Sequence, residues 1–251
     1  MEIEKANEKL KKLDMLKSDF ISLVSHELRT PLSAVRTSAE ILQSEEKVNP
    51  DVQKELFAII IRNIDRQTQL INDILDLSKI EAGKMEFKLE QVDFREIAGV
   101  TLENIGQLAL KKNIIISMGL PDKLSPVFAD REKLIIVLSN LLGNALKFTP
   151  EGGSILLSAK EDQDSIEVRV KDTGIGIEKE ELEKIFYKFY QVETTSQRKI
   201  GGSGLGLSLS RGIIRAHGSE LCVESEPGKG STFFFRLKKG RYDSNAFLPT
   251  S

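Results

Sequence analysis

The sequence predicts two domains of different fold class, a helical hairpin that pairs into a dimeric four-helix bundle and an α+β sandwich after it. The hairpin is indicated by apolar residues at alternating three- and four-residue intervals, for example Leu28, Leu32, Val35, Ala39 and Leu42. This is the spacing of a bundle seam. The sandwich is indicated after residue 84, where helical periods are interspersed with pairs of short strands, as in α+β folds.

The hairpin consists of two predicted helices that meet near Asn49-Pro50. Pro50 suits the first turn of the second helix, and Gly83 is a suitable stop after that helix. Two helices cannot enclose a core by themselves, yet each carries a continuous apolar stripe. We therefore expect a second copy to complete a four-helix bundle.

The chain divides into four expected segments. These are a coiled-coil linker over 1–18 that continues into the first bundle helix, the hairpin over 19–84, the sandwich over 85–240 and a disordered tail over 241–251. Within the sandwich the expected strands are 85–89, 114–118, 127–129, 154–160, 165–171, 221–225 and 232–237. The expected helices are 94–111, 131–148, 179–189 and 205–216.

Composition excludes several classes of protein. The chain has 36 basic and 38 acidic side chains, so it lacks the basic excess of a nucleic-acid binder. The single Cys222 rules out an intramolecular disulfide and suits a reducing compartment. No apolar run reaches the ~18 residues that span a bilayer, and no signal-peptide pattern is present. We expect a soluble, cytoplasmic chain without membrane insertion of its own, which is compatible with the cytoplasmic portion of a membrane-anchored receptor.

One of the two histidines stands in a setting that suits phosphate chemistry. His26 lies in the string SHELRTPL, and a neutral imidazole is a good nucleophile near pH 7. Glu27 can orient the ring or accept its proton, and Thr30 shares the helix face. The other interpretation is a surface histidine beside an unrelated acid. His217 ends a predicted helix and is interpreted as structural.

Three later segments suit a nucleotide. Asn140, Asn144 and Lys147 fall on one face of a helix, where carboxamide oxygens can ligate Mg²⁺ and the lysine can meet phosphates, although the same pattern suits an ordinary polar stripe. Asp172 precedes the glycines of Asp-Thr-Gly-Ile-Gly and can accept a hydrogen bond from an adenine amine, although such a motif alone is usually a turn. Gly201 to Leu207 opens a helix, whose N–H groups suit a polyphosphate.

The order of these segments along the chain is what supports a nucleotide site. The Asn/Lys helix, the Asp-x-Gly-x-Gly turn, the segment from Phe186 to Phe189 and the glycine-rich stretch follow one another. This order resembles the Bergerat-type ATP-binding domain of histidine kinases, gyrase-type topoisomerases, mismatch-repair ATPases and a heat-shock chaperone. SHELRTPL resembles the phosphoacceptor signature of histidine kinases. Together the resemblance is to sensor histidine kinases of two-component systems, over roughly residues 10–238.

The resemblance implies a role for each residue. His26 is the implied phosphoacceptor, Glu27 the general base, and Thr30 the residue that assists hydrolysis of a partner's phosphoaspartate. Asn144 is the implied Mg²⁺ ligand and Asp172 the adenine contact. The other residues implied in nucleotide binding are Asn140, Lys147, Gly174, Gly176, Gly202, Gly204, Leu205 and Gly206.

The resemblance also implies an activity and partners. It implies ATP- and Mg²⁺-dependent autophosphorylation, transfer to an aspartate of a response regulator, and phosphatase activity toward that regulator. The implied partners are a second copy, the receiver domain of a response regulator and an upstream sensor domain outside this chain, with no role for nucleic acid. The alternatives are an inactive nucleotide-binding scaffold and a gyrase- or chaperone-like ATPase.

Two positions depart from the family pattern. Gln191 stands where many relatives have an arginine that can support the γ-phosphate, so Arg198 or Lys199 is expected to substitute. Ser219 replaces one glycine of a common pair after His217, and we expect this difference to be structural.

Overall fold

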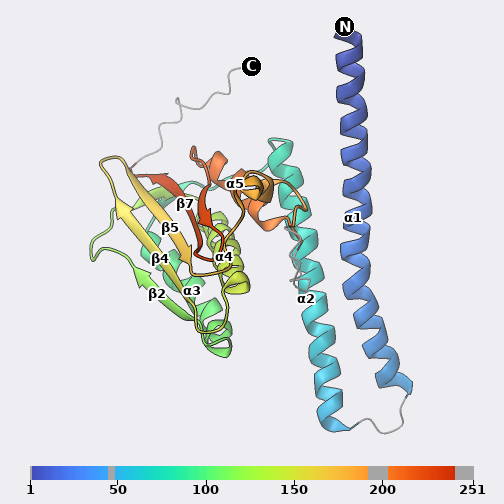
Figure 1. The fold of residues 1–251 in the computed structure, drawn as a ribbon. Helices are drawn as coiled ribbons and strands as arrows, with labels where there is room; N and C mark the ends of the chain where they lie inside the picture. Colours follow the sequence, from blue (N-terminus) through green and yellow to red (C-terminus); the bar gives the residue numbers. More distant parts are fainter. Residues whose placement is uncertain (1, 45–48, 192–202, 241–251) are drawn as a thin grey trace. The chain divides into compact units, whose positions relative to one another are not determined.

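The computed structural model describes residues 2–44, 49–191 and 203–240, which belong to two compact units, Met1–Leu75 and Asp76–Ser251. Figure 1 traces the chain from the two long helices into the sheet-containing unit. None of the helices in these ranges combines the length and the apolar character that a membrane crossing requires.

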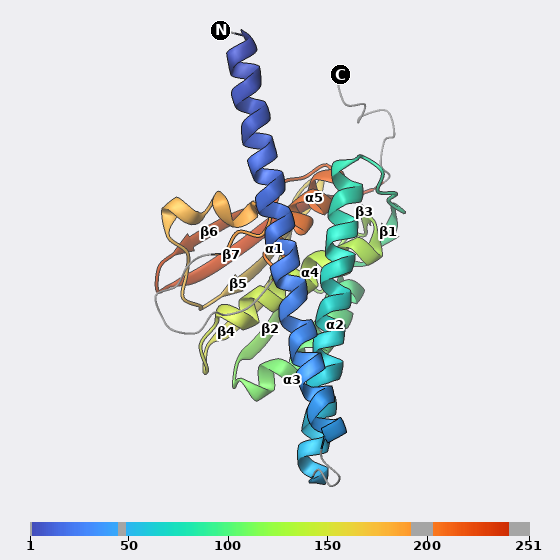
Figure 2. The ribbon, with the colours of Figure 1, turned by 90° about the vertical axis from the view of Figure 1, so that its right-hand side faces the viewer.

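The first unit is an antiparallel pair of helices (Figure 2), α1 over Glu2–Ser44 and most of α2, which spans Pro50–Glu81. The predicted helix start at Pro50 is confirmed, and the Asn49 side chain caps it by accepting from Asp51 N at 2.9 Å. Leu56 and Leu70 of α2 are buried. Many large apolar side chains of the hairpin remain exposed, namely Leu32, Ile41, Val52, Phe57, Ile61, Ile64, Ile71 and Leu75.

The second unit begins with the last turns of α2 and adds helices and strands in a mixed order. In chain order they are β1 (Glu90–Val92), α3 (Phe94–Lys111), β2 (Ile115–Gly119), β3 (Val127–Ala129), α4 (Arg131–Phe148), β4 (Ser154–Glu161), β5 (Ser165–Asp172), the 3-10 turns η1 (Lys179–Glu181) and η2 (Lys184–Phe186), α5 (Gly206–Ala216), β6 (Cys222–Glu226) and β7 (Gly230–Lys238). Five strands form one sheet in the order β2-β4-β5-β7-β6, and β1 pairs with β3. The α+β architecture is therefore confirmed.

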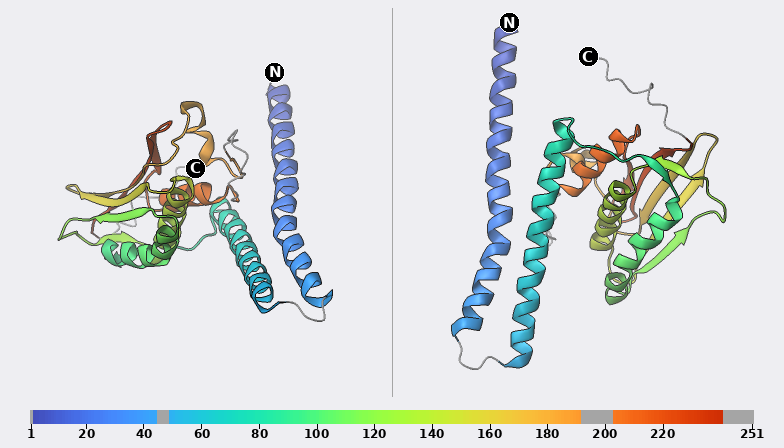
Figure 3. Two further views of the ribbon diagram at one scale, coloured as in Figure 1. Left: turned by 60° about the horizontal axis from the view of Figure 1, so that its bottom comes forward. Right: turned by 180° about the vertical axis from the view of Figure 1, so that it is seen from behind.

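The helices α3, α4 and α5 cover one face of the five-stranded sheet (Figure 3). Strands β4 and β5 alternate buried and more exposed residues, because successive side chains point to opposite faces of a strand. The core lies between this face and the helices. Its largest fully buried side chains include Phe94, Ile97, Leu134, Leu138, Leu141, Leu142, Ile155, Leu157, Ile166, Leu209 and Phe235.

The last turns of α2 pack into the second unit. Asp76 Oδ2 accepts a hydrogen bond from Lys133 Nζ of α4 at 3.1 Å. Gly212 of α5 faces Ile80, and a Cβ at that glycine would lie 3.0 Å from Ile80 Cγ2. The close approach of α2 and α5 therefore depends on a residue without a side chain.

Two expected elements are wrong. No strand covers residues 85–89, because β1 begins at Glu90 and the Lys88 amide donates to Asp130 Oδ2 instead of to a neighbouring strand. The expected helix over 179–189 consists of η1 and η2 followed by irregular backbone. Phe189 has φ 61° and donates its N–H to Gly204 O at 2.9 Å, so a contact with a distant segment overrides the local helical pattern.

His217 joins two helix ends, as its structural interpretation predicted. It is the C-cap residue of α5 and is only 6% exposed. Its Nε2 accepts from the Asp130 amide at 2.9 Å, so Nδ1 carries the proton and donates to Ile213 O at 2.8 Å. Burial lowers the pKa of His217 from its ordinary 6.5, against smaller opposing effects of the Ile213 bond and of Asp130. The folded protein therefore favours the neutral ring.

Acidification should weaken the second unit through His217. Because its pKa is lower in the folded than in the unfolded chain, its contribution to stability is complete above pH 6.5 and is lost as the pH falls through the folded pKa. We expect His217→Gln to lower the unfolding free energy at neutral pH by about 1–2 kcal/mol and to remove part of the pH dependence.

Calorimetric unfolding between about pH 5 and pH 8 measures both effects. His26→Gln is the matched control, since it removes the chain's other histidine, whose side chain is 68% exposed. An unchanged pH dependence in His217→Gln would contradict the assignment.

Candidate functional site

His26 is presented to solvent by α1. Its side chain is 68% exposed, and its Nδ1 lies 3.8 Å from Glu27 Oε1. Because Nδ1 is the ring nitrogen that faces the carboxylate, Nε2 is the nitrogen available to an incoming group. The predicted pairing of an accessible imidazole with an acid is present.

Glu27 is much less accessible than the histidine. Its side chain is 17% exposed, and its Oε2 lies 3.4 Å from a guanidinium nitrogen of Arg66 on α2. The sequence motif did not reveal Arg66, because it lies 39 residues from Glu27 and no local pattern connects the two.

Thr30 lies one turn after His26, and its exposed hydroxyl donates to the His26 carbonyl at 3.2 Å. The oxygen retains lone pairs that can accept a hydrogen bond from water. Pro31 follows inside the continuous helix and has no N–H to donate to the preceding turn. The Thr30 hydroxyl thus adds a hydrogen bond to the turn that carries His26.

Asp172 stands at the end of β5 and is 5% exposed. Its Oδ1 accepts hydrogen bonds from Gly174 N at 2.8 Å and from Ser231 N at 3.2 Å. Burial raises the pKa of this carboxyl, while the two backbone bonds oppose the rise. Both bonds use Oδ1, so Oδ2 can still accept a hydrogen bond from a ligand. The sequence motifs do not point to Ser231, because it lies at the start of β7, 59 residues from Asp172.

The glycines near Asp172 allow close contacts between backbone segments. A Cβ at Gly174 would lie 2.6 Å from Asp172 Oδ1 and 2.8 Å from Phe148 O. Gly176 has φ 71°, and its added Cβ would overlap the Glu226 carbonyl. The predicted need for glycine is thus explained by neighbouring protein backbone as well as by space for a base.

The three polar residues of α4 have different surroundings. Asn140 Nδ2 donates to Gly206 O at 3.2 Å and to Ser210 Oγ at 3.3 Å, which ties α4 to the start of α5. Asn144 is half-buried, and its carboxamide forms no hydrogen bond to any residue that the structure describes. Lys147 Nζ lies 4.6 Å from the centre of the Phe148 ring. Of the two asparagines, Asn144 therefore has the side-chain amide that is more available to a ligand.

The start of α5 is held by the segment after η2. Gly204 has φ 67°, and a Cβ there would lie 2.6 Å from Phe189 Cα. Leu205 is fully buried, and α5 begins at Gly206. The first N–H groups of a helix have no partner within it and suit an anion. The predicted residues Gly202, Arg198 and Lys199 lie outside the described residues.

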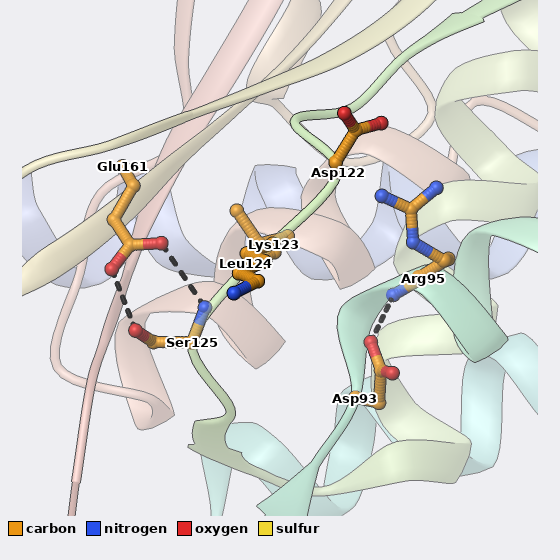
Figure 4. Close-up of a pocket in the computed structure, with 7 residues that line it drawn as sticks. All are labelled: Asp93, Arg95, Asp122, Lys123, Leu124, Ser125 and Glu161. Carbon is orange, nitrogen blue, oxygen red and sulfur yellow. Dashed lines mark hydrogen bonds between the residues drawn. The ribbon is translucent and has the colours of Figure 1, made fainter.

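A separate pocket of about 340 Å³ contains none of the predicted residues. It is lined by Asp93, Arg95, Asp122, Lys123, Leu124, Ser125 and Glu161, as Figure 4 shows. Its Glu161 accepts from Ser125 Oγ at 2.6 Å and from Ser125 N at 3.1 Å. Hydrogen bonds from Lys239 and Ser125 lower the pKa of Glu161 to about 2. Protein groups therefore already satisfy the Glu161 carboxylate in this pocket.

Across the described ranges no cluster of three or more His, Cys, Asp or Glu side chains could hold a metal ion. A cation that depends on a carboxamide and on the oxygens of a bound phosphate needs no such cluster. The arrangement around Asn144 remains suitable for that kind of ligation.

Two family models match the chain. The model described as His Kinase A (phospho-acceptor) domain matches residues 16–83, which contain His26. The model described as histidine kinase-, DNA gyrase B- and HSP90-like ATPase matches residues 129–241, which contain Asn144 and Asp172.

Similar proteins are named as histidine kinases. The sensor histidine kinase WalK of Bacillus subtilis is 34% identical over 90% of this chain and 37% of its own length. The circadian input-output histidine kinase CikA of Synechococcus elongatus is 37% identical over 86% of this chain and 29% of its own. The chain thus spans well under half the length of these curated relatives.

A solved structure has the same fold. Full-length ShkA in complex with AMPPNP is 29% identical, has a TM-score of 0.67, and matches 89% of this chain and 47% of its own. With a phospho-acceptor domain, an ATPase domain of the kinase type and these relatives, the chain belongs to the sensor histidine kinases of two-component systems.

Proposed function

We propose that the chain is the catalytic part of a sensor histidine kinase, in which ATP bound near Asp172 donates its γ-phosphoryl group to His26. The observation that carries the proposal is the exposed His26 imidazole beside Glu27 in a phospho-acceptor domain, in one chain with an ATPase domain of the kinase type. We assign residues 19–84 to the dimerisation and phosphotransfer domain and 85–240 to the ATP-binding domain, with a cytoplasmic location.

Asp172 recognises the adenine base in this proposal. Its Oδ1 is engaged by Gly174 and Ser231, so Oδ2 faces the ligand and accepts from the exocyclic amine. Burial strengthens this bond, because a polar contact is stronger where water is excluded. The AMPPNP complex of ShkA, a protein 29% identical to this chain, supports nucleotide binding by this fold.

Asn144 is the proposed protein ligand of Mg²⁺. The half-buried carboxamide, which has no hydrogen-bond partner among the described residues, fits a site where phosphate oxygens supply the remaining ligands. Magnesium would neutralise charge on the phosphates during transfer. Lys147 and the N–H groups at the start of α5 add positive potential for the same phosphates.

His26 attacks the γ-phosphorus through Nε2. A new Nε2–P bond forms as the bond between the γ-phosphorus and its bridging oxygen breaks, and ADP leaves. The proton of Nδ1 passes to Glu27 Oε1, which is the carboxylate oxygen nearest this nitrogen. Protein groups mainly align the reactants and balance charge in such reactions. The phosphoryl group on His26 then passes to an aspartate of a response regulator.

The hairpin has an exposed apolar surface that suits contact with a second copy of the chain. Its exposed apolar side chains, Phe57, Ile61 and Ile64 among them, are the kind of surface that a four-helix bundle buries. We therefore propose a homodimer, with an upstream sensor domain as the source of the signal. Thr30 is assigned to hydrolysis of the regulator's phosphoaspartate, because its hydroxyl oxygen can orient water next to His26.

Two substitutions separate the two sites. His26→Gln should abolish incorporation of acid-labile phosphate from labelled ATP and leave ATP affinity unchanged. Asp172→Asn should weaken ATP binding about tenfold or more, because an amide donor would replace the acceptor that faces the adenine amine. Filter assays for label and calorimetric titration for ATP measure the two effects. Equal loss of ATP binding in both variants would argue against separate sites.

A glycine pair tests the close backbone contact behind the nucleotide site. Gly176→Ala should lower the unfolding free energy by about 2 kcal/mol or more and reduce ATP affinity, since the new Cβ meets the Glu226 carbonyl. Gly228→Ala is the matched control, because Gly228 has a similar φ of 77° but no atom within 4 Å of an added Cβ. Thermal unfolding and ATP titration of both variants provide the comparison, and equal effects would contradict the contact argument.

Thr30 should matter more for dephosphorylation than for autophosphorylation. Thr30→Ala removes the hydroxyl that can orient water but retains the His26–Glu27 pair, so we expect regulator dephosphorylation to fall about tenfold with autophosphorylation little changed. Release of phosphate from a phosphorylated cognate regulator is the measurement. Thr30→Ser, which retains the hydroxyl, is the control. Full phosphatase activity in Thr30→Ala would remove the assigned role.

A further inference from the structure

Glu27 lies between an imidazole of its own helix and a guanidinium group of the other helix of the hairpin. His26 Nδ1 lies 3.8 Å from Oε1, and Arg66 of α2 lies 3.4 Å from Oε2. We propose that Arg66 is a positioning residue, which holds Glu27 so that Oε1 can take the proton of His26 during autophosphorylation. This inference rests on the proposed function.

The geometry distinguishes the contributions of the two neighbours. A separation of 3.8 Å exceeds the length of a hydrogen bond, so His26 does not fix the carboxylate in this state. Arg66 is the closer partner and binds the oxygen that is not needed for proton transfer. The arginine can therefore restrain the rotation of the carboxylate without competing with the imidazole for Oε1.

The burial of Glu27 gives the arginine a further role. With its side chain only 17% exposed, the carboxylate has lost much of its contact with water, and an ionised group in that setting requires a compensating charge. Among the described residues, Arg66 is the only Lys or Arg within ion-pair distance of Glu27. We infer that Arg66 holds the carboxylate in place, so that Oε1 stays on the side of His26.

The position of Arg66 on α2 makes the base depend on the pairing of the two helices. Glu27 and Arg66 meet only when α1 and α2 have the observed register. His26 and Glu27 are consecutive and need no such pairing. Proton acceptance is therefore sensitive to the packing of the hairpin in a way that the nucleophile is not.

Arg62 provides a matched control on the same helix. It lies one turn before Arg66 and is exposed, with no ion pair or hydrogen bond to any described residue. Arg62→Gln removes the same charge from α2 without touching Glu27. Arg36→Gln is a second control, because it breaks an exposed ion pair with Glu40 at 2.6 Å on α1.

The test measures autophosphorylation of the whole chain with labelled ATP, together with its dependence on ATP concentration. We expect Arg66→Gln to lower kcat about tenfold, within the range of acid–base contributions, with the KM for ATP unchanged. A fall in kcat alone distinguishes a misplaced base from a loss of ATP binding, which would change KM. Arg66→Lys should restore part of the rate, and Arg62→Gln and Arg36→Gln should retain the full rate.

A double-mutant cycle decides whether Arg66 acts through Glu27. In the Glu27→Gln background, Arg66→Gln should have no further effect, because the group it positions is already gone. An equal additional loss in that background would overturn the proposal and assign Arg66 to direct contact with the phosphoryl group. A rate equal to that of Arg62→Gln would also overturn it.

The outcome is separable from the proposed function. If the unmodified chain incorporates no label on His26, both proposals fall. If it is labelled but the rate does not respond to Arg66→Gln, only the role of Arg66 falls. Calorimetric unfolding and light scattering establish whether each variant retains the stability and oligomeric state of the parent chain.

Discussion

The carboxylate of Asp172 is the interaction on which the nucleotide unit depends. One of its oxygens accepts backbone N–H groups from Gly174 and Ser231, which lie just after β5 and at the start of β7. These two strands are neighbours in the sheet, so Asp172 fixes the turns at their shared end. In the proposed function, the second oxygen of the same side chain accepts a hydrogen bond from adenine. The arrangement of these turns and the proposed recognition of adenine therefore depend on one buried carboxylate. Glycine is required around it because the backbone segments come so close together.

The two carboxylates of the candidate site, Asp172 and Glu27, have different partners in their partly or fully buried positions. Asp172 receives backbone hydrogen bonds and no partner cation among the described residues, so burial raises its pKa. Glu27 has an arginine beside it and an exposed imidazole on the other side. Asp172 can accept from an uncharged adenine amine without a cation nearby, whereas Glu27 has Arg66 on the side away from the imidazole, where it can hold the carboxylate in place. The surroundings of each acid suit its proposed task.

Much of the second unit follows from local sequence. The bounds of α4 were predicted correctly because Asp130 caps its first turn and Thr149-Pro150 ends it. Residues 179–189 were predicted as one helix because their apolar period is helical, but the amide of Phe189 binds the distant Gly204 instead. Local periodicity carries no information about that partner.

The candidate site could likewise be predicted only in part from the sequence. Motifs single out His26, Asn144 and Asp172 as candidates because each stands in a recognisable string. They did not identify Arg66 or Ser231, whose relevance depends on which segments the fold brings together. Asn140 was expected beside the metal, and the structure adds a bond from its amide to Gly206 at the start of α5. Tertiary contacts thus assign to some residues a role that their motifs alone do not indicate.

The end of α2 has a mechanical consequence. The helix is continuous from Pro50 to Glu81, and its last turns reach Lys133 of α4 and Gly212 of α5 through Asp76 and Ile80. A Cβ at Gly212 would lie 3.0 Å from Ile80 Cγ2, so any larger residue there would push Ile80 or α5 out of its present position. The size of one side chain therefore limits how closely the end of α2 can approach α5.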